Sequence, residues 1–477
     1  MTWADLSSTF PELALVVTAL ALLLLEVLNS PPRSRMVWVA LAGLGVALAL
    51  ELTLPAEGTF YQGMIAVDRF TRYFDVLFLV ITAATMLIAI PYLRATLEER
   101  GEYFALLLLA TVGMMFMVKA HDLTIVFLGL ELLSISLYVL VAFYRHRVRS
   151  NEAGIKYLLL GAFSSGFFLM GIALLYGSTA ATNYDAIRQS IVSGTQLSPM
   201  LTLAGFGLLL VGFAFKVALV PFHMYAPDVY EGAPTSITAF LTTGPKVAGF
   251  AALLKVIVVS FAVTTQHWSG IIAILAALTM TVGNLTALMQ DNLKRMLAFS
   301  SVAHAGYLAV AILVGTYDAA FALAYYLAIY AVTTLGAFAV VSLIEGDEET
   351  NLSIDSYRGL GKRSPYAAGV FALTMASLAG LPPTAGFLGK YFVFSAAMDE
   401  GYLWLVVVAV LNSLVSVYYY VRPVVAMYMQ SPVVDEPIVL HRAIVPVLLL
   451  VVVVVLGLGL LPMPLVKNGV AAANSLF

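Results

Sequence analysis

Apolar runs of about 20 residues recur along the whole chain, and a helix of that length spans the hydrocarbon core of a bilayer. Hydrophobic residues make up 61% of the 477 residues and charged residues only 11%, whereas soluble domains contain about 25% charged residues. No segment is long and polar enough to fold as a soluble domain. The sequence therefore predicts an all-α, polytopic membrane protein.

Hydropathy and turn residues together predict about fourteen transmembrane helices. The expected helices cover residues 11–29, 36–54, 70–93, 103–118, 122–143, 153–177, 200–221, 234–263, 268–289, 296–315, 318–344, 365–398, 402–428 and 440–461. Most lysines and arginines outside them lie after odd-numbered helices, and cytoplasmic loops collect such residues. Both termini are therefore predicted on the non-cytoplasmic side of the cell's inner (cytoplasmic) membrane.

The chain resembles itself at an offset of 169 residues, which pairs Asp122 with Asp291 and Tyr138 with Tyr307. The matched helices are five apart, so the second copy must enter the membrane from the opposite side. The sequence thus predicts two inverted-topology repeats of five helices. The expected units are an N-terminal three-helix segment (1–102), a first repeat (103–265), a second, inverted repeat (266–430) and a C-terminal fourteenth helix (431–477).

Three lysines lie near the middle of predicted helices, beside prolines expected to break or kink a helix. The lysines are Lys216, Lys246 and Lys390, and the prolines are Pro221, Pro245, Pro382 and Pro383. A lysine at a helix centre costs at least about 2.5–3.5 kcal/mol, and broken backbone at membrane depth is tolerated only inside protein or along a hydrated cavity. One discontinuous helix is therefore expected in each repeat, and a kink is expected beside Lys246.

Glu131 is the one strong candidate for an acid inside a predicted span, and a single carboxylate cannot neutralise three lysines. If a contact between Glu131 and a lysine formed and broke in turn, the pKa of the paired groups would change by whole pKa units. His304 lies in mid-helix and His223 follows the seventh-helix break. Histidine titrates near neutrality, although a membrane histidine also serves as a helix–helix hydrogen-bonding group. These residues predict a protein that moves protons or small cations.

The absence of one residue type and the positions of two further lysines narrow the candidate sites. Cysteine is absent, which excludes disulfides, thiolate catalysis and cysteine-ligated iron–sulfur or zinc sites, so any redox chemistry is expected elsewhere. Lys156 and Lys255 lie towards the ends of their helices, from which their stems can reach headgroups.

Three segments carry a resemblance to a known family: KVALVPFHMYAPDVYEGAPTSITAFLTTGPKVAGF (216–250), DNLKRMLAFSSVAHAGY (291–307) and LAGLPPTAGFLGKYFVF (378–394). They are similar to the antiporter-like membrane subunits of respiratory complex I, and PDVYEGAPTSITAFL most resembles the subunit N family. The resemblance covers essentially the whole chain. It implies fourteen helices with two inverted five-helix bundles, each containing a broken helix.

The resemblance also implies roles for single residues. Glu131 and Lys216 match the family's fifth-helix glutamate and seventh-helix lysine, a pair that modulates the central lysine. That lysine matches Lys246, which would connect two half-channels. Lys390 would serve the exit towards the positive side of the membrane, and His304 would lie between Lys246 and Lys390.

The implied activity is proton translocation by a subunit of NADH–quinone oxidoreductase, driven by electron transfer from NADH to quinone in other subunits. FMN, iron–sulfur clusters and quinone are expected in those subunits, and no cofactor is expected in this chain. The antiporter-like subunit M and the small subunit K are expected neighbours within the lipid bilayer, and no nucleic acid is expected. The alternatives are a stand-alone or multisubunit cation/proton antiporter, and a structural subunit whose lysines clamp helices together.

Overall fold

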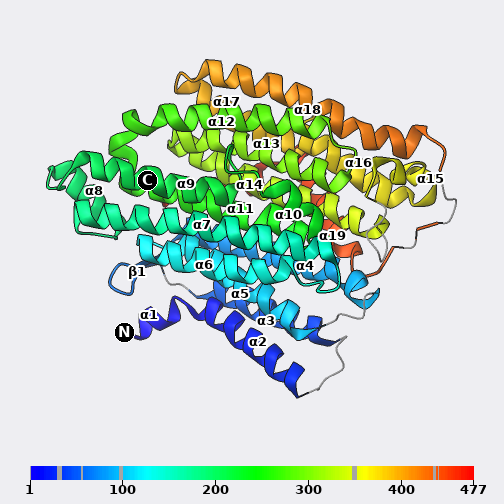
Figure 1. The fold of residues 1–477 in the computed structure, drawn as a ribbon, viewed down its shortest axis with the longest axis horizontal. Coiled ribbons are helices and arrows are strands. Elements are labelled where there is room, and N and C mark those ends of the chain that lie inside the picture. The colour runs from blue at the N-terminus through cyan, green and yellow to red at the C-terminus, as the bar shows by residue number, and fades with distance from the viewer. Residues whose placement is uncertain are drawn as a thin grey trace.

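The computed structural model describes residues 2–28, 35–54, 57–95, 100–345, 352–432, 437–438 and 440–477. Residue 29, the predicted end of the first helix, lies outside them. The described residues are largely helical, with one short hairpin formed by β1 (Gly58–Phe60) and β2 (Ile65–Val67). Figure 1 shows most long helices running side by side across the view, with both termini in its left-hand part and α15 (Leu360–Arg363) at the right.

The elements follow the predicted order. The N-terminal segment contains α1 (Trp3–Ser7), α2 (Phe10–Val27), α3 (Met36–Thr53) and α4 (Arg69–Ala95). The first predicted repeat contains α5 (Gly101–Lys119), α6 (Leu123–Val141), α7 (Val148–Thr179), α8 (Tyr184–Ser193), α9 (Pro199–Val217), α10 (Ala226–Gly232) and α11 (Thr235–Val256), followed by a π turn (Ile257–Phe261) and a 3₁₀ turn (Ala262–Thr264). The second contains α12 (Thr265–Leu288), α13 (Leu293–Val314), α14 (Tyr317–Ile344), a 3₁₀ turn (Ile354–Tyr357), α15, α16 (Pro365–Ala379), α17 (Ala385–Asp399) and α18 (Leu403–Met429).

The C-terminal segment is more complex than the predicted single helix. It consists of α19 (Val445–Val452), a π turn (Val453–Gly457), α20 (Leu458–Leu460) and a further helix, α21 (Met463–Asn474). The run from Val445 to Leu460 and α21 are bent by 85° relative to each other. Pro462 and Pro464 flank the start of α21, and proline disfavours helical geometry in the residue before it, which accounts for the bend.

The described residues contain fewer long apolar helices than the predicted fourteen. Among the described residues, eleven helices are long and apolar enough to cross a membrane, or up to twelve if the bent C-terminal pair is one span. This count takes Thr235–Leu288 as a single 54-residue run and leaves out the broken segment of α16 and α17. The exact number of fourteen therefore stays a prediction.

Equivalent hydrogen bonds mark the two repeats. The backbone N–H of Leu123 donates to the Thr182 carbonyl (2.9 Å), and that of Leu293 donates to the Leu352 carbonyl (2.8 Å). The structural offset is thus 170 at these helix starts, one residue more than the sequence match. Figure 1 places α8, just after the first bond, at the left and α15, just after the second, at the right, as inverted repeats require.

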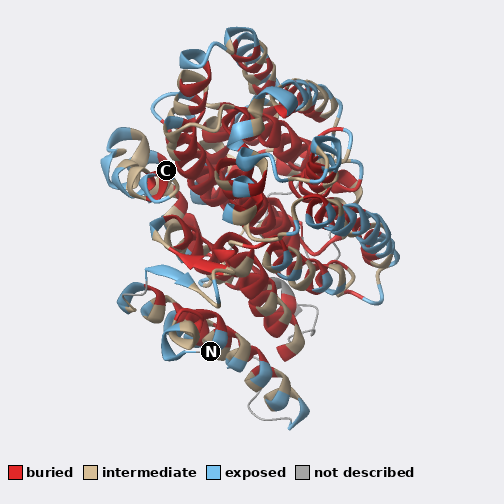
Figure 2. Ribbon diagram, turned by 90° about the vertical axis from the view of Figure 1, so that its left-hand side faces the viewer, coloured by how far each residue is buried: buried red, intermediate tan, exposed pale blue. Residues whose placement is uncertain are grey.

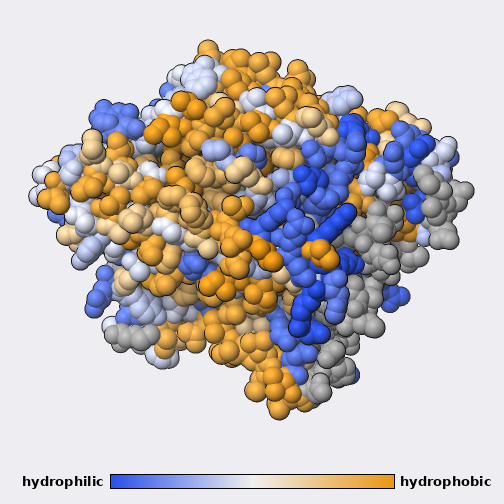
Figure 3. All heavy atoms as spheres, viewed as in Figure 1, coloured by the Kyte–Doolittle hydropathy of each residue, from blue (hydrophilic) through white to orange (hydrophobic). Residues whose placement is uncertain are grey.

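The centre of the bundle is formed by α11, α13 and α14. Every residue of α11 is buried, and so are nearly all residues of the other two. A helix that is apolar all round is a buried helix. Figure 2, seen from the end at the left of Figure 1, shows buried residues concentrated in the middle and exposed residues on the outer helices. Figure 3 shows apolar residues over much of one face and hydrophilic residues gathered in a band in its right half, as expected of a protein in a bilayer.

Small residues let α5 and α6 approach closely. A Cβ atom on Gly113 would lie 2.6 Å from the Gly129 carbonyl oxygen and 2.7 Å from the Leu133 nitrogen. Backbone atoms cannot move aside as a flexible side chain can, and small residues allow such crossings between membrane helices. This contact fixes the position of α6, which carries Glu131.

Gly113→Val is therefore expected to destabilise the protein by about 1–3 kcal/mol or more, because it forces the two backbones apart. The midpoint of thermal unfolding in detergent measures this effect. Gly45→Val on α3 is the matched control, since nothing lies within 4 Å of a Cβ at Gly45. Equal midpoints for the two variants would contradict the close crossing.

Candidate functional site

Lys246 lies at the centre of the buried helix α11 and is 1% exposed. Its Nζ donates hydrogen bonds to the carbonyl oxygen (2.7 Å) and the Oγ (2.9 Å) of Ser301 on α13. Among the described residues, no carboxylate lies within ion-pair distance of this amine. Lys246 is thus held by neutral oxygens, an arrangement that serves both the ammonium and the neutral amine.

The helix break predicted at Pro245 is wrong. Helix α11 continues through Pro245 from Thr235 to Val256. Proline removes one helical donor, but in membranes neighbouring helices and hydroxyl side chains can supply others. Pro245 frees the Leu241 carbonyl, and the Tyr330 hydroxyl of α14 donates to the neighbouring Thr242 carbonyl at 3.1 Å, a contact that holds this turn of α11 in place.

His304 lies on α13 one turn after Ser301 and is 2% exposed. Its Nδ1 is 2.7 Å from the Tyr326 hydroxyl on α14, and its Nε2 is 3.1 Å from the Tyr420 hydroxyl on α18. The Tyr420 hydroxyl also hydrogen-bonds the Ser300 hydroxyl. Ser300 and Ser301 are adjacent, so this network brings Lys246 and His304 into one polar region between four helices.

Lys390 lies beside the broken helix formed by α16 and α17. Helix α16 ends at Ala379, Gly380 has a φ of +83°, and α17 starts at Ala385. Pro382 and Pro383 lie within this interruption. The Lys390 Nζ donates to the Ala379 carbonyl (2.9 Å) and to Ser413 Oγ on α18 (2.9 Å). A cation is stabilised at such a helix C-terminus by the helix dipole.

The Tyr307 ring separates Lys390 from His304. The Lys390 Nζ lies 5.0 Å from the centre of that ring, and the His304 and Tyr307 rings are 5.8 Å apart. Cation–π attraction favours the first contact. The structure thus places Lys390 next to the polar region around His304, with an aromatic ring between them.

Lys216 lies beside the other broken helix. Helix α9 ends at Val217, Ala218 adopts a left-handed conformation with φ of 61°, and Pro221 lies in the connection to α10. The Lys216 Nζ donates to Ser134 Oγ on α6 at 2.9 Å. The stem of Lys216 packs on α11, where its Cγ would lie 3.6 Å from a Cβ on Gly249.

Glu131 and Lys216 make no direct ion pair among the described residues, and Lys216 is bound instead to Ser134. Ser134 is three residues after Glu131, so the two side chains lie on the same face of α6. Glu131 accepts a hydrogen bond from the Ser165 hydroxyl on α7. The direct contact between Glu131 and a lysine, which is expected to form and break, is therefore not formed among the described residues of this structure.

His223 is not joined to the lysines by the hydrogen bonds described above. It is partly buried in the connection between α9 and α10, and its Nδ1 is buried without a hydrogen-bond partner. Of the six predicted site residues, the structure brings Lys246 and His304 into one polar region, places Lys390 beside it, and places Glu131 and the partner of Lys216, Ser134, on one face of α6.

The sequence analysis did not identify a buried cluster of ionisable residues around Lys119. Glu12, Glu51 and Asp75 surround Lys119 between α2, α3, α4 and α5. These acids lie near helix ends and far apart in the sequence, so no local pattern signals them. Lys119 fell one residue beyond its predicted helix.

Lys255 also differs from its expected position at a headgroup. It is 2% exposed, and its Nζ donates to the Val118 carbonyl at 2.9 Å. Helix α11 is buried over its full length, so its last turn is covered by protein rather than lipid. Lys156, by contrast, lies near the surface and pairs with Glu152 (2.7 Å).

A polar contact on α10 connects the two repeats. Asp228 pairs with Lys156 on α7 (2.8 Å) and Arg295 on α13 (3.0 Å), and Arg295 also pairs with Glu231 (2.8 Å). Partial burial acts to raise the pKa of Asp228, but the hydrogen bonds from Lys156 and Arg295 hold it below its ordinary value. These two acids therefore join the first repeat to the second.

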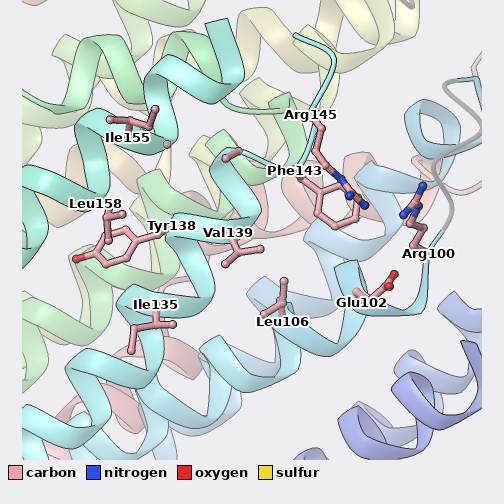
Figure 4. Close-up of a pocket in the computed structure, with 12 residues that line it drawn as sticks. Arg100, Glu102, Leu106, Ile135, Tyr138, Val139, Phe143, Arg145, Ile155 and Leu158 are labelled. Atoms are coloured by element: carbon pink, nitrogen blue, oxygen red, sulfur yellow. The ribbon is translucent and has the colours of Figure 1, made fainter. Parts of the chain in front are cut away.

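A groove of about 610 Å³ lies on the outside of α6 (Figure 4). Ile135, Tyr138 and Val139 of α6 line it, and Arg100 and Arg145 lie close together at one end. Ile135 is one turn after Glu131 on the same helix face. The groove therefore hollows the outer surface of the helix that carries Glu131.

Comparison with known proteins places this arrangement among membrane ion carriers. Residues 120–416 match the sequence family described as NADH:quinone oxidoreductase/Mrp antiporter, TM. The NADH-quinone oxidoreductase subunit N of Trichlorobacter lovleyi is 46% identical over 426 residues, which cover 89% of this chain and 88% of that protein.

Solved structures share the fold. A chain of respiratory complex I from Thermus thermophilus with bound aureothin is 36% identical, with a TM-score of 0.82 and coverage of 96% of this chain and 99% of that one. A chain of the Mrp complex from Dietzia sp. DQ12-45-1b has a TM-score of 0.87 at 22% identity, covering 99% and 97%. The second likeness concerns the fold alone.

Proposed function

The chain belongs to the NADH:quinone oxidoreductase/Mrp antiporter transmembrane family, and on this basis we propose that it is a proton-translocating membrane subunit of an NADH–quinone oxidoreductase, of the subunit N type. The observation that carries the proposal is a pair of buried polar groups at adjacent positions of α13: Lys246 bound to Ser301, and Ser300 joined through Tyr420 to His304. Among the described residues no carboxylate fixes the charge of the Lys246 amine, so both its ammonium and its neutral form can be bound there.

The first half of the route consists of Glu131, Lys216 and Lys246. In the structure Lys216 is bound to Ser134, and a small movement along α6 would bring its ammonium to Glu131. That movement would stabilise the charge on Lys216, whereas a charged Lys216 next to α11 would repel a proton on Lys246. The position of Lys216 therefore controls when Lys246 gives up its proton.

The second half leads from Lys246 to Lys390. A proton from Lys246 passes to the Ser301 hydroxyl, and from Ser300 it passes through Tyr420 to His304. The step between the adjacent Ser301 and Ser300 hydroxyls requires a bridging water, because the Ser301 hydroxyl donates to the Ala298 carbonyl. The step from His304 to Lys390 requires a bridging water or a swing of the lysine, because the Tyr307 ring lies between them. Lys390 then releases the proton towards the positive side of the membrane.

The redox reaction belongs to other subunits in this proposal. Electron transfer from NADH to quinone through FMN and iron–sulfur clusters occurs there, and this chain supplies the proton path. Neighbouring membrane subunits of the M and K types would pack against its sides, and both termini would lie on the non-cytoplasmic side of the inner membrane. The groove beside Glu131 is a candidate contact for such a neighbour.

Proton transport by the purified complex in proteoliposomes tests the function. With NADH and quinone present, we expect the same rate of proton transport in sodium-free and sodium-containing buffer, measured with a pH-sensitive dye. A cation/proton antiporter, the other activity named in the description of the matched family, would instead require sodium or another cation and no NADH. Transport that stops in sodium-free buffer would overturn the proposal.

A further inference from the structure

Four ionisable side chains from four helices meet at the N-terminal side of the bundle. Lys119 Nζ at the end of α5 lies 2.6 Å from Glu12 Oε1 on α2, 3.0 Å from Asp75 Oδ2 on α4 and 3.5 Å from Glu51 Oε2 on α3. All four residues are at most 5% exposed. We call them the Lys119 cluster, and the proton route proposed above does not use them.

In the Lys119 cluster three carboxylates share the one ammonium of Lys119. Arg72, one turn before Asp75 on α4, donates to the Leu54 carbonyl at 2.5 Å, and its positive charge also acts on Glu51. Arg72 and Lys255, which lies at the Val118 carbonyl, offset part of the negative charge. Burying carboxylates without a matching positive charge is costly, so such a site neutralises itself by binding cations or protons.

Protons are the better match for this imbalance. Glu12 Oε2 and Asp75 Oδ1 are buried without a hydrogen-bond partner, and a carboxylic acid adds the donor that two facing carboxylates lack. The described residues contain no group of three or more acids or histidines arranged to hold a metal ion. The lysine ammonium also occupies the space between the carboxylates.

Lys255 connects the Lys119 cluster to the central helix. It lies nine residues after Lys246 on α11, about 13 Å along the helix axis. Its Nζ donates to the carbonyl of Val118, the residue before Lys119. Helix α11 thus carries one buried amine in the central network and a second at the cluster.

We propose that the Lys119 cluster is a proton-binding site that exchanges protons with Lys255 during transport. The inference rests on the proposed function, since it assumes that this chain carries protons. In the exchange, the Lys255 ammonium loses a proton and becomes a neutral amine, and a cluster carboxylate gains it and becomes a carboxylic acid. Beyond the cluster, His121 lies beside the exposed Asp185 (2.8 Å) and marks the way to solvent.

A purely structural interpretation of the same contacts is that they hold α2, α3 and α4 against α5. A structural clamp requires ionised carboxylates and has no effect on proton transport once the protein is assembled. A proton-binding site requires a protonated carboxyl group, and transport depends on it. Asparagine distinguishes the two, because it keeps the shape of aspartate and cannot bind the proton.

Asp75→Asn in the assembled complex is the main test. We expect NADH-driven proton transport in proteoliposomes to fall roughly tenfold or more, as for loss of a positioned proton carrier, with the subunit still present in the purified complex. We also expect the infrared spectrum to lose a carboxylic-acid C=O band. The control is Thr85→Val, which removes a buried hydroxyl of the same helix that bonds only the Ile81 carbonyl. Wild-type transport with an unchanged infrared spectrum would overturn the inference.

Two further variants keep the test decisive. If Asp75→Asn does not assemble, the pair Lys119→Gln and Asp75→Asn removes opposite charges together, and wild-type transport by that double variant would overturn the inference. Lys246→Met is measured in parallel. If Lys246→Met still transports protons, the proposed function fails. If Asp75→Asn transports protons normally and Lys246→Met does not, the proposed function stands and the proposed role of the Lys119 cluster is wrong.

Discussion

Lys246→Met is expected to lower NADH-driven proton transport by about a hundredfold or more, the effect of losing a positioned proton carrier. Methionine keeps most of the apolar stem and its packing within α11. It lacks the Nζ that bonds Ser301, so the network from Ser301 to His304 loses its proton donor. The two lost hydrogen bonds cost about 0.5–1.5 kcal/mol each, and removal of a buried amine from a low-dielectric site offsets part of that cost.

The measurement is proton uptake by proteoliposomes containing the purified complex in sodium-free buffer. Lys467→Met is the matched control, because Lys467 is an exposed lysine on α21 and the chemical change is the same. Normal proton uptake by the Lys246 variant would show that this amine is not on the route. A loss shared by both variants would point to a general effect of removing positive charge.

The central lysines could be predicted because their local sequence is so unfavourable for a charge. Lys216 and Lys390 stand next to prolines and glycines that interrupt the helix, and the structure shows both interruptions. The break predicted at Pro245 is absent, because whether a proline interrupts a membrane helix depends on the helices packed around it. Helix α11 is buried along its whole length, and Tyr330, which contacts it one turn before the proline, lies 85 residues further along the chain.

The partners of His304 show what a single sequence does not reveal. Tyr326 and Tyr420 come from α14 and α18, and many tyrosines of this chain occupy similar apolar surroundings. Only the packing of three helices decides which hydroxyl meets the imidazole. The Lys119 cluster is similar, because its four members are spread over the first 119 residues and each resembles an ordinary helix-end charge.

Lys390→Met is expected to reduce proton transport to the same degree as the change at Lys246, by about a hundredfold or more, and also to loosen the broken helix. The ammonium binds the Ala379 carbonyl at the end of α16 and the Ser413 hydroxyl on α18. Methionine donates no hydrogen bond, so the helix end loses a donor and a favourable charge, worth about 0.3–1 kcal/mol for the dipole alone. Proton transport in proteoliposomes and the midpoint of thermal unfolding measure the two effects separately.

Lys390→Arg separates proton transfer from the structural role of Lys390. Arginine keeps the positive charge and can donate hydrogen bonds to both oxygens. The midpoint of thermal unfolding of the arginine variant is therefore expected to lie closer to the wild-type midpoint than the midpoint of the methionine variant does. A guanidinium remains protonated in proteins, whereas a buried lysine can give up its proton. Proton transport is therefore expected to be lost in the arginine variant as well. Wild-type transport by Lys390→Arg would mean that Lys390 acts as a fixed charge that holds the broken helix, and that the proton leaves the central network by another path.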